Sequence, residues 1–83
     1  MAVLRLLGSE GNLSSASNVG RAKLVRVLNN KTSVQVITQK NSGGTTIATV
    51  TMAAGEIAFI AKAPDDTLTG AATSLAVNVA FAN

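Results

Sequence analysis

The chain has 83 residues, of which 47% are hydrophobic and 13% charged, and its formal net charge is +3. It is too apolar for a disordered chain, and without Cys it is not a disulfide-stapled secreted domain. Because His is also absent, nucleophile–His catalysis is excluded and the common zinc, haem and iron–sulfur sites are disfavoured. We therefore predict a non-enzymatic protein that uses no cofactor.

Apolar and polar residues alternate with a period of two along most of the chain, a pattern that predicts β-strands. The alternating segments are rich in Val, Ile and Thr, which suit a half-buried pleated surface. Turn-forming Asn, Gly, Pro and Asp residues separate these segments. In chain order, the predicted strands cover residues 2–7, 22–29, 33–39, 45–52, 56–62 and 75–81.

Six short strands predict an all-β fold, either a small antiparallel β-sandwich or a barrel. Short turns join the four strands between residues 22 and 62, which favours a central antiparallel meander. In the strand at 56–62, Ile57 and Phe59 alternate with Ile60. Apolar residues on both faces predict a central strand that is covered on both sides.

Residues 8–20 are polar and small, and a connection of this length is unusual in a compact domain. We predict that residues 1–20 form an N-terminal strand or arm with a polar loop, and that residues 21–83 form the β-sandwich domain. The arm could pair with another subunit. Alternatively, the segment is an ordinary first strand followed by a mobile loop.

A domain of this size rarely stabilises itself by its core alone, so we expect a homo-oligomer or docking onto a larger scaffold. Residues 1–40 hold six basic side chains against one acid, whereas residues 41–83 hold one lysine against three acids. The basic part of one copy could therefore face an acidic part of a neighbour. The residues predicted to bind a partner are Leu4, Arg5, Leu6, Leu13, Arg21, Lys23 and Arg26.

Other kinds of site find little support in the sequence. Asp65 and Asp66 are too few acids for a calcium site, so we predict a turn there and no metal. Lys23 and Arg26 alternate onto opposite strand faces, and the two phenylalanines are predicted in the core, so nucleic-acid binding is unlikely on this pattern. No apolar run approaches the length of a membrane helix and no leader pattern is present, so we predict no membrane partner and synthesis in a cytoplasm.

Several features taken together resemble the small β-rich virion structural proteins of tailed phages, particularly phages of marine bacteria. The resemblance covers roughly residues 20–83. It is carried by the succession of central strands, Gly55-Glu56, the apolar strand ending Phe59-Ile60-Ala61-Lys62, the turn Pro64-Asp65-Asp66-Thr67, and the closing run Val77-Asn78-Val79-Ala80-Phe81.

This resemblance implies a virion protein that is assembled in the host cytoplasm, in the first place a homo-oligomeric capsid decoration (cement) protein that binds the major capsid protein. A tail, neck or fibre-attachment subunit is the alternative within the virion. An alternative of another class is a small cytoplasmic β-domain that binds a peptide or a nucleic acid.

Overall fold

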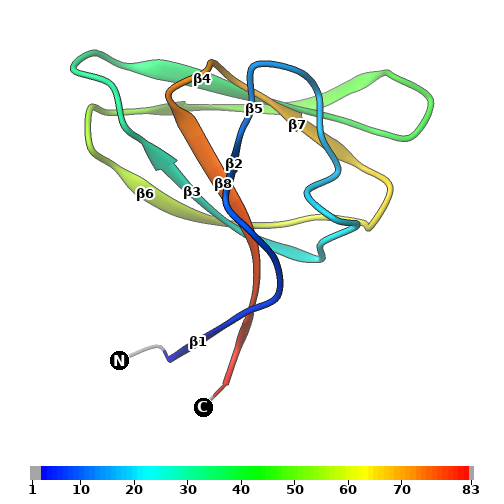
Figure 1. Cartoon of the computed structure of the whole chain (residues 1–83). Helices are drawn as coiled ribbons and strands as arrows, with labels where there is room; N and C mark the ends of the chain where they lie inside the picture. Colours follow the sequence, from blue (N-terminus) through cyan, green and yellow to red (C-terminus); the bar gives the residue numbers. More distant parts are fainter. Residues whose placement is uncertain (1–2, 83) are drawn as a thin grey trace.

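The computed structural model describes residues 3–82, which form two antiparallel β-sheets and no helix (Figure 1). The larger sheet has the order β1-β8-β3-β6, and β2 also pairs with β8. The smaller sheet has the order β5-β4-β7. The strands are β1 (Leu4–Leu6), β2 (Gly11–Asn12), β3 (Leu24–Asn29), β4 (Gln35–Lys40), β5 (Thr46–Met52), β6 (Ile57–Ala61), β7 (Thr67–Thr69) and β8 (Ser74–Phe81).

A small hydrophobic core fills the space between the two sheets. In β3, buried residues alternate with half-buried ones, so Val25 and Val27 point toward the smaller sheet. Ile37 of β4 and Leu68 of β7 meet them from the opposite side. Each strand contributes every second residue, as the pleat requires. These observations confirm the all-β class and the sandwich arrangement of two sheets.

The predicted meander is wrong. β3 pairs with β6 and β8 rather than with β4, and only β4 and β5 form a hairpin of consecutive long strands. The chain crosses from one sheet to the other after β3 and again after β5. This arrangement places Val27 and Ile37 on opposite sides of one core, whereas side-by-side pairing of β3 and β4 would leave that core open.

The segment at 56–62 is not a central strand. Within the described part of the chain, β6 pairs only with β3 and forms an edge of the larger sheet. Ile57 and Phe59 are each 46% exposed, while Ala58 and Ile60 pack against the core. Both faces of β6 are therefore apolar, but only the face with Ala58 and Ile60 packs on the core, and the face with Ile57 and Phe59 is exposed.

The N-terminal segment pairs with strands of its own chain. β1 pairs with β8 of the same chain, and the two extend together beyond the sheets (Figure 1). Residue 2 of the predicted first strand lies outside the described residues. The predicted loop at 8–20 contains β2 and exchanges main-chain hydrogen bonds between Ser17 and Leu68 of β7. These pairings attach the connection to both sheets.

Two buried polar groups tie the sheets together. Asn29, at the end of β3, donates from Nδ2 to the main-chain oxygens of Ser33, Met52 and Ala53 at 3.0, 3.2 and 3.0 Å. Ser74 of β8 donates from Oγ to Oε1 of Gln35 in β4. Buried polar side chains need hydrogen-bond partners, and these two find partners in the opposite sheet. The hydrogen bonds therefore also specify the position of one sheet relative to the other.

Candidate docking surface

The face of the larger sheet that points away from the core is apolar. Paired residues of an antiparallel sheet lie on the same face, so the strand registers identify its members. Leu28 of β3, for example, lies opposite Ile57 of β6 and Leu75 of β8. We define the docking face as Leu4, Leu6, Leu24, Arg26, Leu28, Ile57, Phe59, Ala61, Leu75, Val77, Val79 and Phe81. An antiparallel sheet commonly presents polar residues on the side away from its core, so this surface departs from the usual pattern.

Some apolar side chains of the docking face are buried and others are exposed to solvent. Val77 and Val79 are 5% and 2% exposed but do not belong to the core cluster between the sheets, because they point the other way. Leu6 and Phe81 project from the same face with 69% and 53% of their surface exposed. The rings of Phe59 and Phe81 lie 6.1 Å apart with a tilt of 51°, a favourable aromatic pair. Contiguous exposed apolar surface of this kind marks interaction sites.

One ion pair interrupts this apolar surface. Arg26 lies between Phe59 of β6 and Val77 of β8 in the sheet register. Its Nη1 lies 3.6 Å from Oε2 of Glu10, which follows β1. A pair that is partly exposed adds little to stability. Its consequence is that the one cation of the docking face is neutralised by a neighbouring carboxylate.

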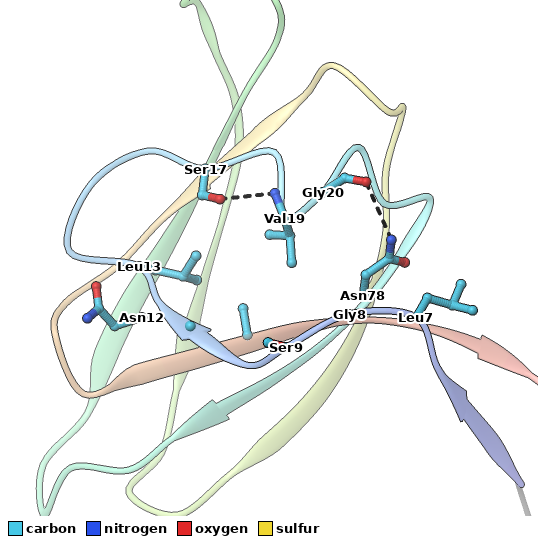
Figure 2. A pocket seen from close by; sticks show the side chains of 11 residues that line it. Leu7, Gly8, Ser9, Asn12, Leu13, Ser17, Val19, Gly20 and Asn78 are labelled. Carbon is cyan, nitrogen blue, oxygen red and sulfur yellow. Dashed lines mark hydrogen bonds between the residues drawn. The ribbon is translucent and has the colours of Figure 1, made fainter.

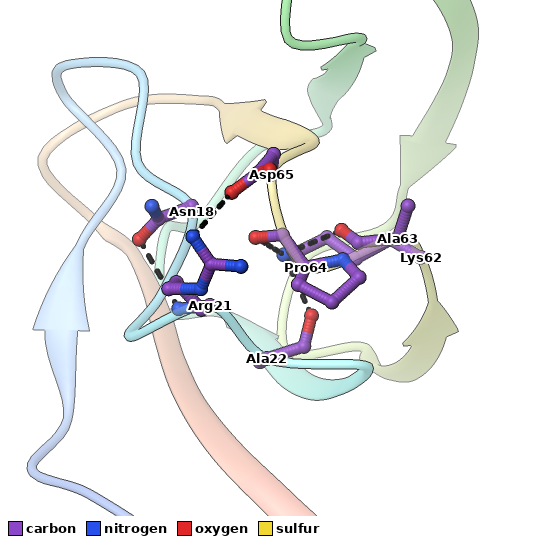
Figure 3. A network of polar contacts seen from close by, with 7 residues as sticks. All are labelled: Asn18, Arg21, Ala22, Lys62, Ala63, Pro64 and Asp65. Carbon is purple, nitrogen blue, oxygen red and sulfur yellow. Dashed lines mark hydrogen bonds and ion pairs between the residues drawn. The ribbon is translucent and has the colours of Figure 1, made fainter.

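The other basic residues predicted to bind a partner lie elsewhere. Arg5 is opposite Ala80, so it points away from the docking face. Arg21 pairs with Asp65, with 2.8 Å between Nη1 and Oδ1, and both side chains are exposed (Figure 3). Lys23 is exposed just before β3. These cations are distributed over different surfaces, so they do not form one stripe with Arg26.

Beside Arg21, the side chain of Lys62 turns inward (Figure 3). Its Nζ donates to the main-chain oxygens of Ala22, Ala63 and Pro64 at 2.7, 3.3 and 3.5 Å. Burial lowers the pKa of Lys62, and the nearby carboxylates of Asp66 and Asp65 oppose that shift. The carbonyls hold the ammonium against the 62–64 turn, so Lys62 is a structural tie between this turn and the start of β3.

Leu13 was predicted to bind a partner but is a core residue, only 1% exposed. It lines the inner side of a hollow of about 250 Å³ between the N-terminal segment and β8 (Figure 2). Two polar contacts join residues that line this hollow: Oγ of Ser17 accepts from the amide of Val19 at 3.0 Å, and Nδ2 of Asn78 donates to the oxygen of Gly20 at 3.5 Å. The lining contains no titratable side chain, so it offers no acid–base pair.

Of the seven residues predicted to bind a partner, the structure brings Leu4, Leu6 and Arg26 together on the docking face. Sequence reasoning missed Phe59 and Phe81, which were predicted in the core and are instead about half exposed. The signal for Phe59 is in β6, where apolar residues occupy both alternating positions along the strand. A strand with one solvated face would carry polar residues at every second position.

Within residues 3–82, no three acidic side chains gather closely enough to hold a metal ion. The same part of the chain contains no helix that is long and apolar enough to cross a bilayer. Comparison with protein-family models, with curated proteins and with solved structures found no match to this chain.

Proposed function

We propose that this chain is a non-enzymatic structural protein that attaches to a larger protein assembly through the docking face. The observation that supports this most directly is the apolar side of the larger sheet that faces away from the core, around Leu6, Phe59 and Phe81. Removing such surface from water gains about 25 cal/mol per Å² of apolar area. A partner with a flat apolar surface would bury these side chains without having to desolvate an unpaired charge.

The form of this proposal that the sequence resemblance implies is a capsid decoration protein, which binds the major capsid protein of a phage as a homo-oligomer. Small size, an all-β fold and an exposed apolar sheet face suit a protein that adds to an existing shell. A tail, neck or fibre-attachment subunit would use the same chemistry at fewer copies. A small cytoplasmic binding domain is the alternative of another class.

The copy number of the chain in purified phage particles tests this proposal. Quantitative mass spectrometry would give its ratio to the major capsid protein. A ratio of the same order supports decoration of the shell. A ratio far below that assigns the chain to the tail or neck, and absence from particles contradicts a virion role.

A pair of substitutions tests the docking face itself. Ile57→Asp places a carboxylate on the docking face, whereas Val36→Asp places it on the outer side of the smaller sheet, at a residue of similar shape and exposure. We expect Ile57→Asp to weaken binding to particles that lack the native chain by at least about tenfold, while Val36→Asp leaves it unchanged. Equal effects of the two substitutions would contradict docking through this face.

Nucleic-acid binding is tested by the salt dependence of affinity, because a protein that neutralises phosphates loses affinity steeply as salt rises. The cations are dispersed, and Arg21 and Arg26 are each paired with a carboxylate. We therefore expect no binding to DNA or RNA at low salt. Tight binding with a steep salt dependence would favour the cytoplasmic binding domain.

A further inference from the structure

We infer that two copies of this chain associate through β5, pairing antiparallel so that their smaller sheets join into one continuous sheet. β5 is an edge strand, and on its second side no strand within residues 3–82 pairs with it. All of its residues from Thr46 to Thr51 are exposed. An exposed edge presents unpaired N–H and C=O groups that can pair with another strand.

Among the strands at the sheet edges within residues 3–82, β5 is the longest that has no charged residue and no covering segment. β7 has three residues, and Ser17 pairs with Leu68 at its edge. β1 has three residues with Arg5 at its centre, and β6 is also uncharged but has only five residues. β5 has seven residues without charge, Pro or Gly. Natural sheets protect their edges with charges, short strands or covering segments, so an unprotected edge indicates a partner strand.

The sequence of β5 suits pairing with itself. When Thr49 lies on the two-fold axis, it faces Thr49 of the second copy, and Ala48 faces Val50 of the second copy. Ala48 and Val50 lie on the core side of the smaller sheet, because they pair with Gln39 and Ile37. The register irregularity between Gln39 and Lys40 leaves Ile47 without a partner in β4, whereas Ala48, Thr49 and Val50 are paired one to one.

A second observation at the same edge is an open cleft between the two sheets. The cleft has a volume of about 290 Å³, and Ala48 and Val50 line it together with core residues such as Ile37 and Leu68. Val50 remains 44% exposed although it faces the core side. Pairing of two β5 strands would cover this side of the cleft with the matching Ala48 and Val50 of the second copy.

Charge does not oppose this association, since residues 41–55 contain no charged side chain. The contact is small, because pairing along one short strand buries well below the ~800 Å² per partner of a standard interface. We therefore expect a dissociation constant in the micromolar range, roughly 1–100 μM. This inference specifies the homo-oligomer of the proposed function, and its contact surface on β5 adjoins the docking face at Phe59, which also lines the cleft.

Single-cysteine variants test the register. The chain contains no native Cys, so each variant carries one thiol. Directly opposed residues have Cα atoms ~4.5–5.5 Å apart, within disulfide range, so Thr49→Cys should crosslink under mild oxidation. Thr51→Cys lies on the same strand face, but in the dimer its two copies are about 13 Å apart along the strands.

We expect Thr49→Cys to form the disulfide dimer at least about tenfold faster than Thr51→Cys at equal concentration. Thermal unfolding of both variants in the reduced state verifies that each is folded. Equal crosslinking rates would indicate random collision and overturn the inference. Faster crosslinking at Thr51 would overturn the register.

Sedimentation velocity over a range of concentrations tests the association without crosslinking. Thr49→Lys places two like charges opposite each other on the axis and should shift the association midpoint to at least about tenfold higher concentration. Thr38→Lys adds the same charge to the adjacent strand β4 and should shift it far less. Ile57→Asp should leave the midpoint unchanged. Loss of association in Ile57→Asp but not in Thr49→Lys would overturn the β5 contact. The docking face itself is tested by particle binding, which is a separate measurement.

Discussion

The side-chain amide of Asn29 donates to the main-chain oxygen of Met52 at 3.2 Å, across a separation of 23 residues. Asn29 ends β3 in the larger sheet, and Met52 ends β5 in the smaller sheet. Oδ1 of the same side chain accepts from the amide of Lys31 at 3.2 Å. One fully buried amide therefore holds the turn after β3 and the end of β5 in place.

Replacing Asn29 by Ala should lower the free energy of unfolding by about 2–3 kcal/mol, because the buried carbonyl of Met52 and the partly buried carbonyl of Ala53 lose their side-chain donor. Urea unfolding monitored by circular dichroism measures this loss. Asn30→Ala is the matched control, since Asn30 is exposed and a surface substitution should change stability by less than about 0.5 kcal/mol. Similar losses for both variants would show that the amide network is not the cause.

Gly70 is required by close approach rather than by an unusual backbone angle. A Cβ at this position would lie 2.7 Å from Oγ of Ser74 and 2.8 Å from Cδ1 of Ile37. We expect Gly70→Ala to destabilise the fold by about 1–3 kcal/mol, as overpacking does. Gly11→Ala, whose added Cβ meets nothing within 4 Å, should be nearly neutral in the same thermal unfolding experiment. A neutral Gly70→Ala would contradict the tight packing between β7 and β8.

The buried ammonium of Lys62 should make stability depend on alkaline pH. Burial lowers its pKa in the folded state, so the unfolded chain holds the proton up to a higher pH than the folded chain. Between the lowered pKa and the ordinary lysine value of about 10.4, the free energy of unfolding should therefore rise with pH. Urea unfolding of the wild-type chain at pH 8, 9 and 10 measures this contribution.

Lys62→Met should remove that alkaline gain and cost about 1–3 kcal/mol, because the oxygen of Ala22 loses its donor. The stability difference between the wild type and Lys62→Met should thus widen as pH rises. Lys23→Met removes one exposed lysine and controls for the change in net charge. A difference that narrows with rising pH would contradict the sign of the shift.

Arg21 adopts a left-handed backbone conformation with φ of 58°, which costs free energy for any residue with a Cβ. Its ion pair with Asp65 is exposed and contributes little. We therefore expect Arg21→Gly to be more stable than Arg21→Ala by about 1 kcal/mol, since both lose the ion pair and only Gly relieves the strain. Chemical denaturation of the two variants measures this difference, and equal stabilities would contradict the strain.

The candidate site was only partly predictable from the sequence. Leu4, Leu6 and Arg26 were singled out and do share the docking face. Leu13 was singled out as well, but a leucine in a polar segment gives no local sign of whether it turns inward or outward. Phe59 was assigned to the core because alternation distinguishes two faces without showing which of them is covered.

The period-two alternation determined six of the eight strands within residues 3–82 and the all-β class, because the pleat is a local property that each segment carries in its own residues. The short strands β2 and β7 were not predicted, since two or three residues are too few to show an alternation. Tertiary structure alone decided which strands pair. Val25 and Val27 of β3 could be buried beside β4 or across from it, and only the closure of two sheets over one core selected the second arrangement. The same closure left β5 at an edge and the outer side of β3, β6 and β8 exposed, since a chain of this length has two layers and no third to cover them.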